Sequence, residues 1–321
     1  MTTPQQPIQS GFDAGSTADD VLAGIDLTGR LAVVTGGYSG IGLETTRALV
    51  RAGAHVVVPA RRPETAAAAL ADLGDAVEVD QLDLGDQDDV ADFADRLLAS
   101  DRSVDLLIAN AGIMACPETR IGPGWEAQFG TNHLGHFALV TRLWPALARD
   151  GGARVVSLSS IGHLRGGIRW DDVMWTHDYD KWAAYGQAKT ANALFARHLD
   201  SLAADRGVRA FSVHPGGIMT PLQRHLPREE MVALGWVDEQ GNLVASGFKT
   251  PEQGAATSVW AATSPRLDGL GGVYCEDCDV AAPYDGSRRA GVAEWATDPE
   301  QASRLWDLSV ELTGCDLPPA G

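Results

Sequence analysis

Seven short apolar runs alternate with longer helix-like stretches, and this alternation constrains the fold more than any other feature of the chain. The runs are Leu31–Thr35, His55–Pro59, Ala76–Leu82, Val104–Ala109, Arg154–Leu158, Val208–Val213 and Gly272–Cys275. Because they contain Val, Ile and Leu without regular polar alternation, they are typical of strands buried on both faces of a parallel sheet. The stretches between them suit crossover helices, at Leu43–Arg51, Val90–Leu98, Trp125–Leu147, Ala183–Ala204 and Pro251–Ala262.

This pattern predicts an α/β fold of the Rossmann type, a doubly wound seven-stranded parallel sheet with helices on both faces. Residues 1–24 precede the pattern and are rich in Thr, Gln, Pro, Gly, Ser and Asp, which indicates a flexible N-terminal arm. Residues 25–321 contain neither an internal repeat nor a linker that would divide them. We therefore expect a single domain over residues 25–321.

The charge balance excludes one class of partner. With 25 Lys and Arg against 43 Asp and Glu, the 321-residue chain has a formal net charge of −18, whereas nucleic-acid binding needs a basic face for phosphate contacts. The apolar runs fall short of the roughly 20 residues that cross a bilayer. The N-terminal residues lack the basic and apolar segments of a signal peptide, so we expect a cytoplasmic protein without a membrane segment.

No metal site is expected from the cysteines or histidines. Four scattered cysteines are too few for a disulfide framework: Cys116, Cys275, Cys278 and Cys315. Two of them have C-x-x-C spacing, but no second pair completes a zinc site and no strand-to-helix turn suggests a redox pair. The spacing of four histidines resembles no ligand set, which favours structural hydrogen bonds for His133, His136, His163 and His214.

The first apolar run leads into a glycine-rich turn, Thr35-Gly-Gly-Tyr-Ser-Gly-Ile-Gly42, and then into a helical stretch. Gly36, Gly40 and Gly42 permit a tight turn, a close approach of the backbone to a pyrophosphate and close packing of helix on strand. The helix N-terminus offers free N–H groups and positive potential to phosphates. Its position between strand and helix favours a dinucleotide site over an ordinary glycine turn.

The end of the second apolar run distinguishes between dinucleotides. An acidic residue there would bind the ribose 2′-hydroxyl of NAD, whereas an arginine would accept the 2′-phosphate of NADP. This chain has Arg61 and Arg62, with no carboxylate before Glu64. Guanidinium groups bind phosphate through paired hydrogen bonds. We therefore predict NADP(H); the alternative is solvated surface arginines, which would leave NAD(H) open.

A tyrosine and a lysine four residues apart, Tyr185 and Lys189, lie on one face of a predicted helix. With five tyrosines and three lysines in the chain, roughly 0.05 such pairs are expected by chance. Because a nearby cation favours phenolate, we expect Lys189 to lower the pKa of Tyr185 toward a value useful for proton transfer. A solvent-exposed helical pair is the alternative interpretation.

Further motifs follow in order after the glycine-rich turn. They are Asp83-Leu84, Asn110-Ala-Gly112, Asn132 in Asn-His-Leu-Gly-His-Phe, Ser159-Ser160, Tyr185-Gly-Gln-Ala-Lys189 and Pro215-Gly-Gly-Ile-Met-Thr220. This ordered set, within the stretch from about Ile25 to Cys315, resembles the short-chain dehydrogenase/reductase superfamily. The nearer resemblance is to its retinol-dehydrogenase-like and protochlorophyllide-reductase-like branch, which commonly uses NADP(H). Three segments carry it: Ser-Ser-Ile-Gly-His163, Tyr185-Gly-Gln-Ala-Lys-Thr-Ala-Asn192 and Arg304-Leu-Trp-Asp-Leu-Ser-Val-Glu-Leu312.

The resemblance implies hydride transfer between the nicotinamide and a carbonyl or alcohol substrate. Tyr185 would be the general acid/base, and Lys189 would lower its pKa and bind the nicotinamide ribose. Ser160, rather than Ser159, would hold the substrate oxygen, while Asn132 would support a water relay. Cofactor contacts are implied for Gly36, Tyr38, Ser39, Gly40, Ile41, Gly42, Arg61, Arg62, Asp83, Leu84, Asn110, Ala111, Gly112, Tyr185, Lys189, Pro215, Gly216, Ile218 and Thr220.

Two segments are predicted to border the substrate: a flap at residues 161–184, which includes Trp170-Asp-Asp-Val-Met-Trp175, and a lid at residues 221–250. Apolar residues in the lid favour a lipophilic substrate, namely Leu222, Leu226, Met231, Val232, Leu234 and Trp236. The resemblance also implies a homodimer or homotetramer. The alternative function is a catalytically silent dinucleotide-binding sensor or scaffold, which the presence of the tyrosine, lysine and serine disfavours.

Overall fold

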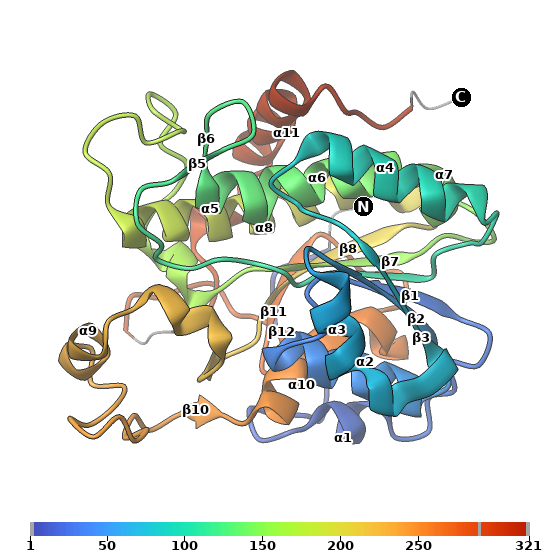
Figure 1. Cartoon of the computed structure of the whole chain (residues 1–321), viewed down its shortest axis with the longest axis horizontal. Helices are drawn as coiled ribbons and strands as arrows, with labels where there is room; N and C mark the ends of the chain where they lie inside the picture. The colour runs from blue at the N-terminus through green and yellow to red at the C-terminus, as the bar shows by residue number, and fades with distance from the viewer. Residues whose placement is uncertain (1–2, 288–289, 319–321) are drawn as a thin grey trace.

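A single eight-stranded sheet forms the centre of the computed structural model, which describes residues 3–287 and 290–318 (Figure 1). Its strands are β1 (Leu31–Val34), β2 (His55–Ala60), β3 (Val77–Gln81), β4 (Leu106–Ala109), β7 (Arg154–Leu158), β8 (Arg209–His214), β11 (Val273–Glu276) and β12 (Asp279–Val280). The order is β12-β11-β8-β7-β4-β1-β2-β3. All neighbours pair in parallel except β11 and β12. The doubly wound fold is confirmed, and the short edge strand β12 is an addition to it.

The strand order changes direction between β1 and β4. In open α/β sheets, ligands bind beyond the carboxyl ends of the strands at such a switch point. The glycine-rich turn follows β1, and the Asn110-Ala-Gly112 motif follows β4. Sheet topology therefore brings these two motifs to the same point.

Helices cover both faces of the sheet, as Figure 1 shows. One face carries α4 (Gln87–Ala99), α6 (Gly135–Arg142), α7 (Trp144–Leu147), α8 (Lys181–Ala203) and α11 (Pro299–Thr313); the other carries α1 (Ala18–Leu22), α2 (Gly40–Arg51), α3 (Pro63–Ala69) and α10 (Pro251–Thr263). Adjacent strand residues enter opposite cores, Val33 on one side and Val34 on the other. Because both faces are covered, β1 shows no polar alternation.

The predicted helix Trp125–Leu147 is broken into shorter elements. After a hairpin of β5 (Arg120–Ile121) and β6 (Trp125–Glu126) come α5 (Ala127–Phe129), the π-helical turn η2 (Gly130–Leu134), α6 and α7. Glu126 caps α5 by accepting the N–H groups of Gln128 and Phe129 at 2.9 and 2.7 Å. Pro145 lies in the first turn of α7, where its missing N–H is tolerated. Asn132 therefore lies in a π-turn, a feature frequent at functional sites.

Described residues of the N-terminal arm, which is expected to be flexible, contact the domain. The side chain of Gln5 donates to the carbonyls of Tyr274 and Ala281 at 2.9 and 2.7 Å and accepts the N–H of Tyr274 at 2.9 Å. Helix α1 then buries Val21 and Leu22 in the core beside α10. The polar composition suggested flexibility, but these polar groups satisfy backbone groups near the sheet edge.

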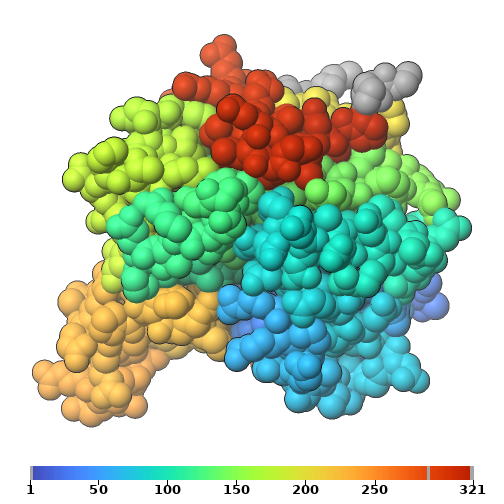
Figure 2. All heavy atoms as spheres, turned by 45° about the horizontal axis from the view of Figure 1, so that its top comes forward, coloured from blue at the N-terminus to red at the C-terminus, as the bar shows by residue number. Residues whose placement is uncertain are grey.

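The predicted lid leaves the sheet after β8 and returns at α10. It begins with the turn η5 (Pro221–His225) and helix α9 (Arg228–Ala233), and its two ends are joined by pairing of β9 (Gly217–Ile218) with β10 (Phe248–Lys249). In Figure 2 this segment is the orange lobe that projects from the body of the molecule. The remaining short turns are η1 (Ala71–Ala76), η3 (Ile161–Arg165), η4 (Ala204–Arg206), η6 (Pro265–Leu267) and η7 (Glu294–Ala296). Across residues 3–287 and 290–318, no helix is long and apolar enough to cross a membrane.

Candidate active site

The glycine-rich turn is packed so tightly that side chains are excluded from it. A Cβ at Gly42 would lie 2.4 Å from the carbonyl oxygen of Gly36 and 2.5 Å from Nδ2 of Asn110. Gly36 and Gly40 also have positive φ angles of +66° and +53°, which side chains disfavour. The turn therefore leaves backbone accessible at the start of α2, and the residues present fit the pyrophosphate of a dinucleotide.

Thr35 joins the ends of β1 and β4. Its hydroxyl accepts the N–H groups of Asn110 and Ala111 at 2.9 and 3.0 Å, and its carbonyl accepts Nδ2 of Asn110 at 2.8 Å. The Asn110-Ala-Gly112 motif is thus held against the glycine-rich turn. Gly112 lies close to both Asn132 and Lys189, because a Cβ there would lie 3.1 Å from Oδ1 of Asn132 and 3.8 Å from Nζ of Lys189.

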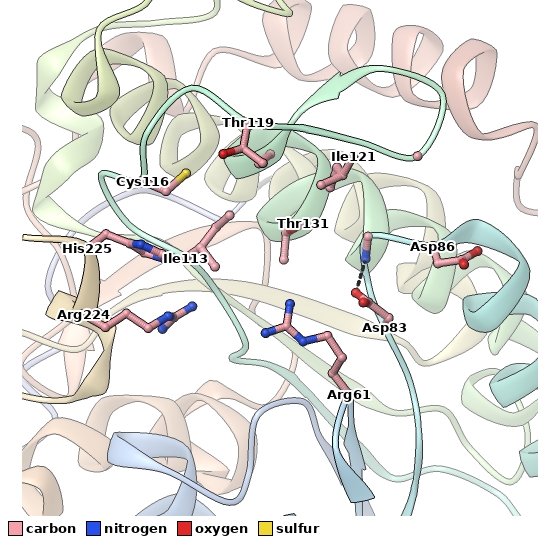
Figure 3. A pocket seen from close by; sticks show the side chains of 13 residues that line it. Arg61, Asp83, Asp86, Ile113, Cys116, Thr119, Ile121, Thr131, Arg224 and His225 are labelled. Carbon is pink, nitrogen blue, oxygen red and sulfur yellow. Dashed lines mark hydrogen bonds between the residues drawn. The ribbon is translucent and has the colours of Figure 1, made fainter.

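Two adjoining cavities, the larger of about 430 Å³, lie beyond the ends of β1, β2 and β4 (Figure 3). The predicted cofactor residues that line them are Gly36, Tyr38, Arg61, Asp83, Leu84, Ala111 and Gly112. Arg62 is instead the N-cap residue of α3, outside both linings. Several further lining residues are not among the predicted cofactor contacts, including Ile113, Cys116, Thr131, Arg224 and His225.

The other predicted cofactor residues lie around the glycine-rich turn and the loop after β8. Ser39 is the N-cap residue of α2, whose first turn contains Ile41. Gly216, which follows Pro215, has a φ of +101° and donates its N–H to Nδ1 of His214. A Cβ at Gly40 would lie 3.2 Å from Cβ of Thr220, so the loop after β8 reaches the glycine-rich turn. A Cβ at Gly254 would lie 2.7 Å from Cγ1 of Ile218 and 2.8 Å from Cγ2 of Ile41.

Tyr185 is buried on α8, and the hydroxyl of Ser160 is close enough to its phenol to lower the pKa of Tyr185 against the effect of burial. Ser160 Oγ accepts the N–H of Gly162 at 3.0 Å, so its own proton is free to point to Tyr185. A Cβ at Gly162 would lie only 2.9 Å from Cε1 of Tyr185, so glycine permits this approach. Ser159 is oriented differently, donating to the carbonyl of Lys189 at 2.7 Å. The structure therefore brings Ser160, rather than Ser159, to the tyrosine.

Lys189 lies one turn further along α8, with Nζ 5.7 Å from the centre of the Tyr185 ring. Its ammonium donates to the carbonyl of Leu158 at 2.8 Å, a group that also accepts Nδ2 of Asn192. Burial lowers the pKa of Lys189 to about 7. Burial also raises the pKa of Tyr185 to about 12, opposed by the Ser160 hydrogen bond. The expected lowering of the Tyr185 pKa is therefore not found in the protein alone, because desolvation of the phenolate dominates.

Asn132 is held by both ends of its side chain. Oδ1 accepts the N–H of Ile113 and Nδ2 donates to the Ile113 carbonyl, each at 2.9 Å. The main-chain carbonyl of Asn132 accepts Nδ1–H of His136 at 2.9 Å, and Nε2 of His136 lies 2.8 Å from the hydroxyl of Thr35. Because burial lowers the pKa of His136 to about 4, this histidine is neutral and connects the π-turn to the glycine-rich turn.

The other histidines also have structural hydrogen bonds, as predicted. Nε2 of His163 accepts the N–H of Ala293 at 3.1 Å, while Nδ1 donates to the carbonyl of Ser160 at 2.6 Å. His133 contacts the hydroxyl of Ser309 at 2.8 Å. Within the described part of the chain, no group of three or more His, Cys, Asp or Glu residues has metal-binding geometry. Burial also raises the pKa of both C-x-x-C thiols, the opposite of a reactive pair.

An apolar cluster surrounds Tyr185 on the side of the lid. Its buried members are Met114, Ala115, Tyr185 and Leu226, with Trp182, Leu222, Met231 and Trp236 packed against them. Glu230 of α9 connects lid and α8 by accepting the indole N–H of Trp182 at 2.8 Å and pairing with Lys181 at 2.5 Å. Four of the six lid residues predicted to face a lipophilic substrate thus belong to this cluster; Val232 does not, and Leu234 is 39% exposed.

Residues 168–174 of the predicted flap pack away from the cluster around Tyr185. Ile168, Trp170, Val173 and Met174 cluster with Trp125 and Leu305, and Trp170 donates its indole N–H to Gln301 on α11 at 2.6 Å. Arg304 of α11 lies 4.0 Å from the centre of the Trp170 ring. This part of the segment is therefore anchored to the C-terminal helix, because its aromatic residues find an apolar surface there. Trp182, near the end of the same predicted flap, instead packs against the cluster around Tyr185.

Comparisons with known proteins agree with this arrangement. The family model for short chain dehydrogenases matches residues 30–231. A probable oxidoreductase from Streptomyces lividans is 48% identical over 297 residues, covering 89% of this chain and 98% of its own. Retinol dehydrogenase 12 from Mus musculus is 39% identical over 295 residues, with 90% and 88% covered.

Among solved structures, a putative uncharacterized protein from Mycobacterium Paratuberculosis has a TM-score of 0.73 and 34% identity, covering 95% of this chain and 100% of its own. Sequence, fold and site geometry thus lead to one family, whose members are oxidoreductases that bind a nicotinamide dinucleotide. The chain belongs to the short-chain dehydrogenase/reductase family.

Proposed function

We propose that this oxidoreductase uses NADP(H) to interconvert a lipophilic carbonyl compound and its alcohol, with Tyr185 as the general acid/base. The observation that carries the proposal is the position of Tyr185. The hydroxyl of Ser160 is close enough to the phenol to lower its pKa, Lys189 lies on the same helix, and the Tyr185 ring belongs to the apolar cluster under the lid. A proton donor, a second hydroxyl and a cation thus meet beside an apolar surface.

In the reductive direction, Ser160 binds the substrate oxygen and Tyr185 gives it a proton, while bound NADPH supplies the hydride. In the oxidative direction, Tyr185 accepts the proton of the alcohol. Lys189 supports the phenolate electrostatically and binds the nicotinamide ribose, and Asn132 supports the path by which a proton returns through water. These residues lie close to one another: Ser160 and Tyr185 both border Gly162, and Asn132 and Lys189 both border Gly112.

The lid cluster leads to a prediction about the substrate. NADPH consumption with an aldehyde series is expected to rise with chain length, by about three- to fourfold in kcat/KM per buried CH2. Leu226→Ser should flatten this dependence because Leu226 is 6% exposed within the cluster. Leu243→Ser, on the same lid but 48% exposed, is the matched control. A preference for short hydrophilic aldehydes would contradict the lipophilic assignment.

Cofactor preference rests on Arg61, which lines the cavity directly after β2. Arg61→Asp should lower kcat/KM for NADPH by about 10²-fold, because a charge-assisted hydrogen bond is lost and a like charge is added. The value for NADH should not fall. Arg62→Asp makes the same charge change outside the cavity lining and should have a small effect. Equal losses in the two variants would show that overall charge, rather than an Arg61 contact, determines cofactor preference.

The alternative, a catalytically silent dinucleotide-binding protein, makes an opposite prediction. It would bind NADPH but show no turnover with any aldehyde, ketone or alcohol of the panel. The placement of Ser160 beside Tyr185 favours an enzyme, because a serine next to the phenol is not needed to bind a dinucleotide at the glycine-rich turn.

A further inference from the structure

Two arginines from distant parts of the chain face each other across the cofactor cavity. Arg61 follows β2, whereas Arg224 lies in η5 at the start of the lid, and both line the two adjoining cavities. In Figure 3 their guanidinium groups point toward one another from opposite sides. The first residue is the predicted cofactor contact; the second was not expected near it.

Neither guanidinium is neutralised by a carboxylate of the described chain. Among residues 3–287 and 290–318, no Asp or Glu oxygen lies within 4.0 Å of either group, although thirteen other ion pairs of Lys or Arg are formed there. The nearby Asp83 accepts the N–H of Gly85 at 2.9 Å instead. The side chain of Arg224 donates to the carbonyl of Pro221 in its own turn, at 3.1 Å.

Within the described residues, the two guanidinium groups therefore lack a negatively charged partner. Two like charges that face one another repel, and desolvation together with Arg61 lowers the pKa of Arg224. A phosphate group between them would remove the repulsion and accept paired hydrogen bonds from each planar guanidinium. A phosphate monoester, which carries between one and two negative charges at neutral pH, suits two cations better than a neutral ribose hydroxyl does.

We propose that Arg224 is the second arginine of a 2′-phosphate site, which it completes with Arg61 when NADP(H) binds. This inference rests on the proposed use of NADP(H). Arg224 lies in the lid, whereas Arg61 directly follows β2. A phosphate bound by both side chains therefore connects the lid to the sheet. NADP(H) thereby orders the segment that carries Leu222 and Leu226 beside Tyr185. The lid then recognises the cofactor as well as the substrate.

Equilibrium binding by calorimetry tests the contact without any turnover. In the wild-type protein, NADP⁺ and 2′,5′-ADP should bind more tightly than NAD⁺ and 5′-ADP. Arg224→Gln should weaken NADP⁺ and 2′,5′-ADP binding about tenfold or more and leave NAD⁺ and 5′-ADP unchanged. Arg224→Lys should recover part of the loss. Arg228→Gln removes the same charge from the neighbouring helix α9, outside the cavity lining, and should bind all four ligands normally.

Proteolysis by a glutamate-specific protease tests the lid. Cleavage after Glu229, Glu230 or Glu239 should be slowed by NADP⁺ more than by NAD⁺ in the wild-type protein, and this difference should disappear in Arg224→Gln. Unchanged NADP⁺ affinity in Arg224→Gln would overturn the inference and leave the NADP(H) proposal intact. Equal weakening of all four ligands would place Arg224 at the diphosphate and overturn the 2′-phosphate assignment. A wild-type protein without preference for NADP⁺ would instead overturn the proposed cofactor, and this inference with it.

Discussion

Tyr185→Phe is expected to lower kcat by about 10³-fold while leaving cofactor affinity nearly unchanged. Phenylalanine keeps the ring that packs in the apolar cluster and removes only the hydroxyl beside Ser160. A positioned proton donor contributes about 10² to 10⁴ in rate, and no other group that we find at this site replaces it. Steady-state kinetics and NADPH binding by fluorescence titration give the two quantities separately.

The matched control for this variant is Tyr284→Phe. Tyr284 is 37% exposed and does not line the cavities or belong to the cluster around Tyr185. Both variants should unfold at temperatures near that of the wild-type protein, because one hydroxyl is lost without a change of volume. Turnover within a few-fold of wild type in Tyr185→Phe would rule out the proposed general acid/base.

Lys189→Met should abolish most turnover and at the same time stabilise the protein. Lys189 is 5% exposed, and its ammonium donates to the carbonyl of Leu158, which keeps its bond from Asn192 in the variant. Methionine fills a similar volume without a buried charge. We expect kcat/KM to fall by about 10²-fold or more, since the group that supports the phenolate is removed.

The pH dependence of this stabilisation follows from the lowered pKa of Lys189, about 7 in the folded protein against 10.5 ordinarily. Between these values the unfolded chain binds a proton that the folded protein does not, so the lysine makes the free energy of unfolding rise with pH. Below pH 7 both states are protonated and the penalty of the buried charge is complete.

The gain from Lys189→Met should therefore be largest at pH 7 and below, and shrink as the pH approaches 10. Urea unfolding of wild type and variant at pH 6.5, 8 and 9.5, without cofactor, measures this difference. Wild type and variant differ only at residue 189, so the titration of groups distant from this residue cancels in the difference between their free energies of unfolding. A variant that is less stable at pH 6.5 would show that the ammonium contributes net stability through contacts with its surroundings.

The sheet was predictable because each central strand obeys a local rule. Residues of β1, such as Val33 and Val34, enter opposite cores, so burial on both faces appears directly as an unbroken apolar run. The two-residue strand β12 has no such run. The helix predicted over Trp125–Leu147 is largely helical, but composition does not reveal its start: Glu126 accepts the N–H groups that begin α5.

The site could be predicted in part, for reasons that depend on sequence distance. Tyr185 and Lys189 are four residues apart on one helix, so their proximity needs no tertiary information. The sequence predicts a lowered pKa for Tyr185, whereas burial raises it. The reason is that the pattern shows the neighbouring lysine but not the burial of the phenol. Trp170 was assigned to a substrate flap because no local pattern shows that α11 offers its indole a partner at Gln301.

By itself, the sequence determined the order of buried strands, the glycines that exclude side chains from the turn after β1, and the chemical groups carried by α8. These properties depend on residues that are close in the chain. Only the tertiary structure decided how strongly Lys189 and Tyr185 are desolvated, and which cations meet at the cofactor cavity. Arg61 and Arg224 are separated by more than half the chain, and only the folded sheet and lid bring their charges to one cavity.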